Sequence, residues 1–234
     1  MRVKNSWFIL LLWILIIFIT AVLLSNLDSR INREAIKVSL DDTKPIIAFT
    51  FDDGPNEQYT PQVLDILYEK KVPATFFVLG KNIAGNERIL KEIVQSGHEL
   101  GNHTYSHADL TLLAQEEIMS EIGQTQELVE KIIPGYALKY VRPPYGRCNQ
   151  AVEEAINGHI VLWEVDSGDW EKVEAQTIYN TVVNVNKVRD GDIIVFHDDN
   201  SSTVVALKKI IGELQARGYQ FGTLSQLYET KTKR

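Results

Sequence analysis

Two groups of residues in this chain have the types and spacing of a metal site with a catalytic carboxylate. Asp52 and Asp53 follow an apolar segment and precede Gly54-Pro55, and His103 and His107 are separated by three residues. A His-x-x-x-His pair spaces two imidazoles for one metal ion, on a helical turn or on a tight loop. One carboxylate and two histidines are three protein ligands, which leaves coordination positions for water and substrate. Such open positions are typical of a catalytic metal.

Each group also has a simpler interpretation. Asp53-Gly54-Pro55 is good turn chemistry, because Asp-Gly favours positive φ and proline fixes the next residue. The histidines could be two solvated surface residues. The occurrence of both groups in one chain favours the metal site.

The two adjacent carboxylates at a strand end should point apart, so Asp53 or Asp52 can bind metal while the other faces a water molecule. A divalent ion such as Zn²⁺ lowers the pKa of its water towards about 7, and a free carboxylate can act as general base. His197 is the natural proton donor to the leaving group, because its pKa can lie near the working pH. Asp166 and Asp169 could orient His197 and raise its pKa. His197 could instead be a packed, hydrogen-bonded core residue.

Three further residues could either contribute to the site or be structural. Arg142 could pair with Asp52 and keep it ionised, or form only a surface salt bridge. Trp170 offers a flat apolar face on which a sugar ring can stack. The single Cys148 cannot form an internal disulfide, and we interpret it as an incidental small residue.

The residues of interest lie at the carboxyl ends of short apolar segments typical of buried parallel strands. These alternate with amphipathic segments over about seven units, which predicts an α/β fold, either a (β/α) barrel or an open doubly wound sheet. The barrel is favoured, because it gathers the ends of all its strands at one face. The predicted strands are Ile46–Phe51, Ala74–Leu79, Glu99–Asn102, Tyr140–Arg142, Ile160–Val165, Asp192–His197 and Gln220–Thr223.

Helices are predicted between these strands. The first begins with Thr60 as N-cap and Pro61 at the first helical position, and the second begins at Asn86 and ends at Gly97. The remaining predicted helices are Gln115–Ile132, Asn149–Asn157, Ala175–Val188 and Val204–Arg217.

The composition is that of a globular protein with a separate N-terminal segment. The 234 residues are 44% hydrophobic and 24% charged, and the net charge of -7 argues against nucleic acid as a partner. Trp7–Leu24 is an almost unbroken apolar run after Arg2 and Lys4, and at about 1.5 Å per residue it comes close to spanning a membrane.

We therefore predict a single membrane anchor over residues 1–24, with a domain outside the cytoplasm. A cleaved signal peptide and secretion are the alternative, although no small-residue cleavage site follows the run. Residues 25–44 are predicted to be a linker, and residues 227–234 a polar tail.

The chemistry-bearing residues together resemble the polysaccharide deacetylases that share the NodB homology domain, carbohydrate esterase family 4. The resemblance covers residues 45–226 and implies a distorted (β/α) barrel for that region. Its motifs, in family order, are Thr50–Pro55, His103–His107, Arg142–Gly146, Asp166–Trp170 and Ile194–His197.

The first three motifs carry roles for the metal and the base. The resemblance implies that Asp52 is the general base and that Arg142 contacts it. It also implies that Asp53, His103 and His107 bind the metal.

The other roles concern the substrate and the general acid. By the same resemblance the backbone N–H of Tyr145 binds the oxyanion, and Asp169 orients His197, the general acid. Trp170 and Val195 line the pocket for the acetyl group. Val195 stands where the family often has leucine, which should change the pocket size only slightly.

The resemblance implies a metal-dependent enzyme that removes acetyl groups from N-acetylhexosamine residues of an extracellular glycan, with peptidoglycan as the expected substrate. The expected metal is Zn²⁺, with Co²⁺ or another divalent ion as alternatives. The expected partners are a peptidoglycan or chitin-like polysaccharide and, through the anchor, a membrane; the catalytic domain is expected to be monomeric. Two alternatives stay open: an esterase for O-acetyl groups, as in acetylated xylan, and a membrane-tethered glycan-binding module without turnover.

Overall fold

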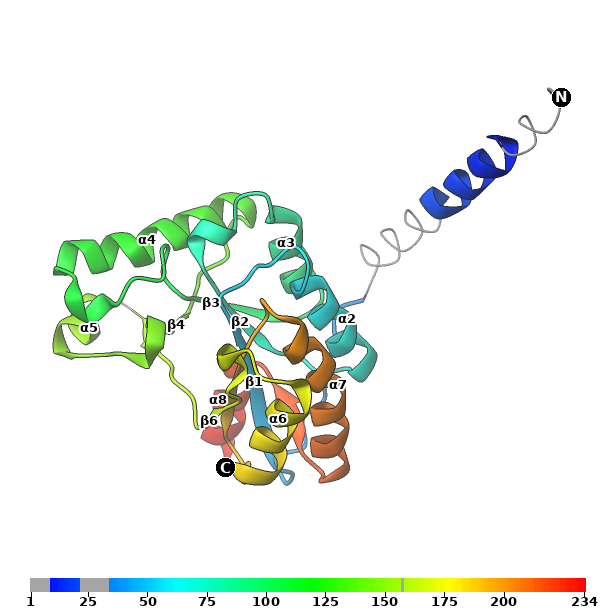
Figure 1. The fold of residues 1–234 in the computed structure, drawn as a ribbon. Helices are drawn as coiled ribbons and strands as arrows, with labels where there is room; N and C mark the ends of the chain where they lie inside the picture. The colour runs from blue at the N-terminus through cyan, green and yellow to red at the C-terminus, as the bar shows by residue number, and fades with distance from the viewer. Residues whose placement is uncertain (1–8, 22–33, 157) are drawn as a thin grey trace, which may run out of the picture. The chain divides into compact units, whose positions relative to one another are not determined.

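A computed structural model of the protein describes residues 9–21, 34–156 and 158–234 (Figure 1). The chain divides into two units, Met1–Ala35 and Ile36–Arg234, and the second unit carries every predicted site residue.

The second unit is built on a curled parallel sheet. β1 lies between β2 and β7, the full path runs in the order β5-β4-β3-β2-β1-β7-β6, and β8 pairs with the first half of β1. In the described part of the chain no ladder joins β5 to β6, so the sheet forms a barrel-like arrangement open at that point. The strands are β1 (Ile46–Asp52), β2 (Thr75–Val78), β3 (Glu99–Asn102), β4 (Tyr140–Val141), β5 (His159–Ile160), β6 (Val165–Asp166), β7 (Ile193–His197) and β8 (Gln220–Gly222).

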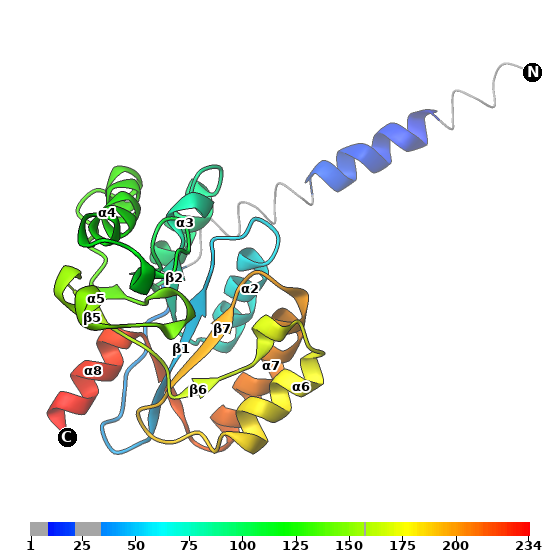
Figure 2. The same cartoon turned by 60° about the vertical axis from the view of Figure 1, so that its left-hand side comes forward.

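In the second unit, α2, α3, α4, α6 and α7 lie around the outside of the strands (Figure 2). Side chains of α2, α3, α4, α6 and α7 form the main hydrophobic core with one face of the sheet, while α8 contributes Leu224 and Leu227 to a smaller core on the other face. The helices are α2 (Thr60–Lys70), α3 (Glu87–Gln95), α4 (Gln115–Ile132), α5 (Gln150–Ala155), α6 (Ala175–Asn180), α7 (Ser201–Ala216) and α8 (Leu224–Lys233).

The alternation of side chains along β1 explains how a fully buried strand places a carboxylate on the inner face of the curled sheet. Phe49 and Phe51 pack into the main core under the helices, whereas Ala48 belongs to the smaller core on the other face. Because successive strand residues point to opposite faces, Thr50 and Asp52 continue the face of Ala48. The strand therefore ends with a carboxylate inside the curl of the sheet.

One predicted strand is wrong. Ile160–Val165 forms two short strands, β5 and β6, instead of one. Val161 N–H still donates to Val141 O of β4, but Glu164 N–H donates to Ile193 O of β7. The apolar run crosses the opening of the sheet from one edge to the other, and hydrophobicity alone does not reveal such a crossing.

Several predicted helix ends differ from the structure, and α7 begins at Ser201 and not at Val204. Tyr59 and not Thr60 is the N-cap of α2, and Thr60 is its first helical residue. The predicted helix Ala175–Val188 is regular only as far as Asn180 and continues as a π-helical segment, Thr181–Val185.

The domain extends beyond its predicted limits at both ends. The predicted polar tail, 227–234, lies almost wholly in α8, which Thr223 caps and which buries Leu227 and Thr230. At the other end, Ile36 N–H donates to Ser96 O and Asp41 N–H donates to the Gln220 side chain. Residues 36–44 of the predicted linker therefore pack on the domain, and residues 25–33 lie outside the described part.

The predicted anchor is described only in its middle, where residues 9–21 are helical. Within the described ranges, no helix is both long and apolar enough to cross a membrane. Residues 1–8 and 22–24 of the predicted anchor lie outside those ranges, so the anchor stays a prediction.

Candidate active site

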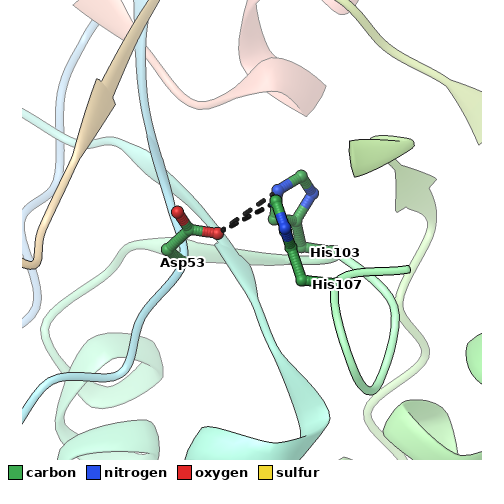
Figure 3. A group of neighbouring side chains, drawn as sticks. All are labelled: Asp53, His103 and His107. Atoms are coloured by element: carbon green, nitrogen blue, oxygen red, sulfur yellow. Dashed lines mark ion pairs between the residues drawn. The ribbon is translucent and has the colours of Figure 1, made fainter. Parts of the chain in front are cut away.

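Asp53, His103 and His107 converge at the carboxyl ends of β1 and β3, as predicted. Asp53 Oδ1 lies 3.5 Å from His103 Nε2 and 3.4 Å from His107 Nε2 (Figure 3). The three candidate ligand atoms all lie within 4.8 Å of one another. This spacing brings three donors around one point without placing any two of them in a short hydrogen bond.

The chemistry of these donors fits a divalent cation. Asp53 Oδ1 is buried and has no hydrogen-bond partner within the described structure. His103 Nδ1 lies 2.7 Å from Arg142 O, and because a carbonyl only accepts, Nδ1 carries the proton and Nε2 presents its lone pair. Burial lowers the pKa of His107, against the opposing charge of Asp53, which favours the neutral ring that a metal requires.

The direction of Asp53 corrects the expectation that the two carboxylates point apart. Asp53 has a φ of 73°, and its carbonyl accepts a 2.7 Å hydrogen bond from the Asn82 side chain. This left-handed conformation breaks the strand alternation and turns the Asp53 carboxylate towards His103. Asp52 Oδ2 lies 3.9 Å from His103 Nε2, so both carboxylates face the same site.

Asp52 forms a buried ion pair with Arg142. Arg142 Nη1 donates to Asp52 Oδ1 at 2.7 Å and to Thr50 Oγ1 at 2.8 Å, and Arg142 is 0% exposed. The interpretation of Arg142 as a surface salt bridge is therefore wrong. One oxygen of Asp52 is held by the guanidinium, and Oδ2 is left facing the three candidate ligands.

Arg142 also spans the opening in the sheet. Its Nε donates to Val161 O at 3.1 Å and its Nη2 donates to Leu162 O at 3.0 Å, and its guanidinium lies 4.1 Å from the centre of the Phe77 ring. These are the carbonyls of the segment that crosses from β5 to β6. The segment between β5 and β6 thus supplies the backbone carbonyls that hold the Arg142 side chain in place.

His197 and Asp169 form a second carboxylate–histidine pair. Asp169 Oδ1 lies 2.7 Å from His197 Nδ1, while Asp169 Oδ2 accepts from His197 N at 2.8 Å and from Thr203 Oγ1 at 2.5 Å. Burial lowers the pKa of His197, but the hydrogen bond and charge of Asp169, with the charges of Asp52 and Asp53, raise it to about 9. His197 therefore carries a proton at neutral pH.

Asp166 does not share this role. Its Oδ1 accepts a 2.8 Å hydrogen bond from Gly168 N and shapes the turn that leads to Asp169. The predicted pairing of Asp166 with His197 is not found, because this turn occupies the carboxylate.

Most of the predicted site residues line one pocket of about 340 Å³, whereas Arg142 and Asp169 are fully buried and contact the lining residues Asp52 and His197. Val195 is buried in the pocket, whereas Tyr145 and Trp170 are 60% and 57% exposed and stand at its rim. The Tyr145 ring packs edge-on against His107 with centroids 4.7 Å apart. The lining comprises Asp52, Asp53, His103, His107, Tyr145, Trp163, Asp166, Trp170, Val195 and His197.

Two residues near this pocket are absent from the sequence-based prediction. Trp163 lines it from the segment between β5 and β6. Asp198 lies just outside it, is 0% exposed and accepts a hydrogen bond from Thr60 Oγ1. Burial raises the pKa of Asp198 to about 7. The only sequence signal for Asp198 was its position directly after His197.

Comparison with known proteins places these features in context. Residues 39–159 match the family model described as polysaccharide deacetylase. The chain is 40% identical over 196 residues to the peptidoglycan-N-acetylmuramic acid deacetylase PdaC of Bacillus subtilis, a match that covers 84% of this chain and 41% of PdaC. It is also 40% identical over 200 residues to a peptidoglycan-N-acetylglucosamine deacetylase of Bacillus cereus, covering 82% of this chain and 71% of the relative.

The fold is also similar to that of a solved relative. A solved structure of the Bacillus subtilis peptidoglycan deacetylase PdaC superposes with a TM-score of 0.79 at 40% identity, and the match covers 83% of this chain and 95% of that one. The chain thus spans less than half of full-length PdaC but nearly all of the part seen in that structure.

Proposed function

The chain belongs to the polysaccharide deacetylase family, and from this premise we propose that it is a hydrolase that removes acetyl groups from N-acetylhexosamine residues of peptidoglycan. One observation carries the proposal. A carboxylate held by a buried arginine and a histidine hydrogen-bonded to a buried carboxylate line the same pocket as three converging metal donors. Amide hydrolysis needs these functions together: a base for water, an electrophile for the carbonyl and an acid for the amine.

Asp53, His103 and His107 would hold a divalent cation, with Zn²⁺ the first choice for two imidazoles and one carboxylate. When bound, such an ion activates water and polarises the acetamide carbonyl.

Asp52 would be the general base. Its Oδ1 is held by Arg142, so Oδ2 is the oxygen that accepts the proton of the attacking water. The Arg142 guanidinium, buried beside Asp52, fixes the orientation of this carboxylate through a charge-assisted hydrogen bond. The attacking oxygen would form its bond to the acetamide carbon as its proton passes to Asp52.

His197 would be the general acid. Its Nδ1 is held by Asp169, so its Nε2 proton is the one available for transfer. As the carbon–nitrogen bond breaks, the amine nitrogen takes this proton and leaves as the free amino sugar, and acetate is the other product. The N–H of Tyr145 would donate to the developing oxyanion, while Val195 and Trp170 enclose the acetyl methyl group.

Peptidoglycan is proposed because both relatives are named for it, although they are named for different sugars at the same 40% identity. Acetate release should be measured from peptidoglycan fragments containing either N-acetylglucosamine or N-acetylmuramic acid. An O-acetylated xylan fragment should be included. Faster turnover of the O-acetyl substrate would identify an esterase instead.

The metal requirement is tested with a chelator and with His103→Ala. We expect both to abolish acetate release, with recovery of the chelated wild type after addition of Zn²⁺. Activity that survives both treatments would refute the metal-dependent mechanism. Glycan binding with no acetate from the wild type, unchanged in Asp52→Asn, would identify a binding module without turnover.

The proposed location is the outer face of a membrane, with residues 1–24 as the anchor. The support is the apolar run Trp7–Leu24, followed by a domain whose proposed substrate lies outside the cytoplasm. Protease treatment of intact cells should remove the domain while leaving a cytoplasmic marker intact. A protected domain would refute this location, and recovery of the protein in the medium would indicate a cleaved signal peptide.

We further propose that the catalytic domain acts as a monomer, because one chain supplies the full set of proposed catalytic residues. Light scattering during size-exclusion chromatography should give one chain per particle for a domain starting near Ile36. Activity found only in a dimer fraction would contradict this.

A further inference from the structure

A carboxylate from α4 holds the loop between the two metal-ligand histidines. Glu121 Oε2 accepts hydrogen bonds from Tyr105 N at 3.0 Å and from Ser106 N at 2.7 Å, and Glu121 Oε1 accepts from Ser106 Oγ at 2.7 Å. Glu121 is half-buried and does not line the pocket. Glu121 therefore contacts the loop without forming part of the pocket lining.

The loop needs such support because of its backbone. Thr104 has a φ of 72° and His107 a φ of 68°, a left-handed region that is sterically unfavourable for non-glycine residues. Tyr105 and Ser106 lie between them, and two successive N–H groups facing one side make a natural site for an anion. The Glu121 carboxylate fills that site.

Other contacts hold different atoms of this loop. Thr104 O accepts from Gly80 N and Tyr105 O from Lys81 N, while the Lys81 ammonium donates to Ser106 O. These contacts fix carbonyl groups, and the amides at the two ends of the loop are held by Thr104 N–H donating to Asn102 Oδ1 and His107 N–H donating to Thr104 Oγ1. Glu121 is the acceptor for the two amides midway between the histidines, so it bears directly on the orientation of His107.

We propose that Glu121 is a positioning residue for metal binding, which holds the loop so that His107 Nε2 stays 3.4 Å from Asp53 Oδ1. The inference rests on the metal site of the proposed function. Hydrogen bonds from amides to a carboxylate are charge-assisted and about twice as strong as neutral ones. Both the geometry and the charge of Glu121 therefore matter to the loop.

The test compares Glu121→Ala and Glu121→Gln with Glu127→Ala, a matched control at an exposed position of the same helix. The affinity of the metal-free proteins for Zn²⁺ is measured by competition with a chromophoric chelator, and the Co²⁺ absorption spectrum reports ligand geometry. We expect Glu121→Ala to weaken Zn²⁺ binding about 10- to 100-fold, as loss of support behind a metal ligand commonly does. Glu121→Gln should fall between this variant and the wild type, because its amide oxygen still accepts from the loop.

The outcomes separate the two proposals. Wild type that binds no Zn²⁺ would refute the metal site itself. Wild-type binding with unchanged affinity in Glu121→Ala, or an equal loss in Glu127→Ala, would refute the role of Glu121 alone. If Glu121→Ala does not fold, as judged by circular dichroism, Glu121→Gln decides: affinity and a Co²⁺ spectrum identical to the wild type would overturn the proposal.

Discussion

Two carboxylate–histidine arrangements contribute residues to the pocket, and they differ in the spacing of their atoms. Asp53 Oδ1 stands 3.4 and 3.5 Å from two imidazole nitrogens and makes no hydrogen bond within the described structure, whereas Asp169 Oδ1 stands 2.7 Å from one imidazole nitrogen. The wider arrangement, Asp53 with His103 and His107, leaves a point at which a cation can meet three lone pairs. The tighter arrangement, Asp169 with His197, already holds a proton between its two atoms. In the proposed function, the same residue types thus serve metal binding on one side of the pocket and proton transfer on the other.

Backbone geometry accounts for much of this difference. Asp53 and His107 both have positive φ, which turns their side chains towards each other from the ends of different strands. Asp169 instead uses both of its oxygens, on the ring and backbone of His197 and on Thr203. A carboxylate with two occupied oxygens has little capacity left for a metal ion.

The largest expected effect comes from removing the carboxylate of the wider arrangement. Asp53→Ala should abolish both Zn²⁺ binding in the chelator assay and acetate release, because the two remaining imidazoles cannot complete the site. Asp65→Ala, a carboxylate change on α2 away from the pocket, serves as control. Retained Zn²⁺ affinity in Asp53→Ala would contradict the assignment of Asp53 as a ligand.

The next effect comes from the tighter arrangement. Asp169→Asn removes the charge that opposes burial, so the pKa of His197 should fall from about 9 towards or below its ordinary range. A general acid must be protonated, so the alkaline limb of kcat/KM should move to lower pH, and kcat should drop about 100-fold. Zn²⁺ affinity should stay within about threefold of the wild type, since Asp169 is not among the three candidate ligands. An unmoved alkaline limb would contradict the assignment of His197 as the acid.

Metal loading should couple the two arrangements. A divalent cation beside Asp53 repels the proton on His197, so Zn²⁺ should lower the pKa of His197 by roughly one to two units. Titration of the imidazole by nuclear magnetic resonance, with and without Zn²⁺, measures this shift directly. A pKa that does not respond to saturating Zn²⁺ would show that the cation binds elsewhere.

The smallest effect concerns a third carboxylate. Asp198 also has a buried oxygen without a partner in the described structure, but its other oxygen accepts from Thr60 Oγ1, and among the described residues no ion pair joins Asp198 to a histidine. Its pKa is raised to about 7 by burial, so in the folded protein it takes a proton where Asp53 would take a cation.

The raised pKa of Asp198 determines whether its contribution to the free energy of unfolding grows or falls with pH. The pKa of Asp198 is higher in the folded than in the unfolded state, so its favourable contribution is complete below about pH 4 and is lost as the pH rises through about 7. Asp198→Asn cannot ionise. Its free energy of unfolding relative to the wild type should therefore rise by about 1 to 3 kcal/mol between pH 4 and pH 8. Urea unfolding of the metal-free proteins at both pH values measures this, and a difference independent of pH would contradict the shifted pKa.

The sequence predicted the architecture because its signals are local. Glu99–Asn102 and Gln115–Ile132 have the predicted bounds of β3 and α4, since each is defined by its own apolar pattern and its own ends. The helix α8 was missed, although Thr223 and Gln226 form a capping box, because its later residues are mostly polar. Its Leu227 is buried only because the sheet curls around it.

The residue types at the strand ends, and therefore the kind of chemistry, were determined by the sequence alone. Asp52, Asp53, His103 and His107 could be identified from type and spacing, because parallel strands bring their carboxyl ends to one edge. Tertiary structure decided how these residues are used. It set the direction of Asp53 through a positive φ. It placed Asp166 in a hydrogen bond to Gly168 N and not to His197. It also brought Glu121 against the loop between the two histidines. Each of these depends on contacts between segments that sequence patterns do not pair, and contacts of this kind decide where a carboxylate binds a metal and where it holds a proton.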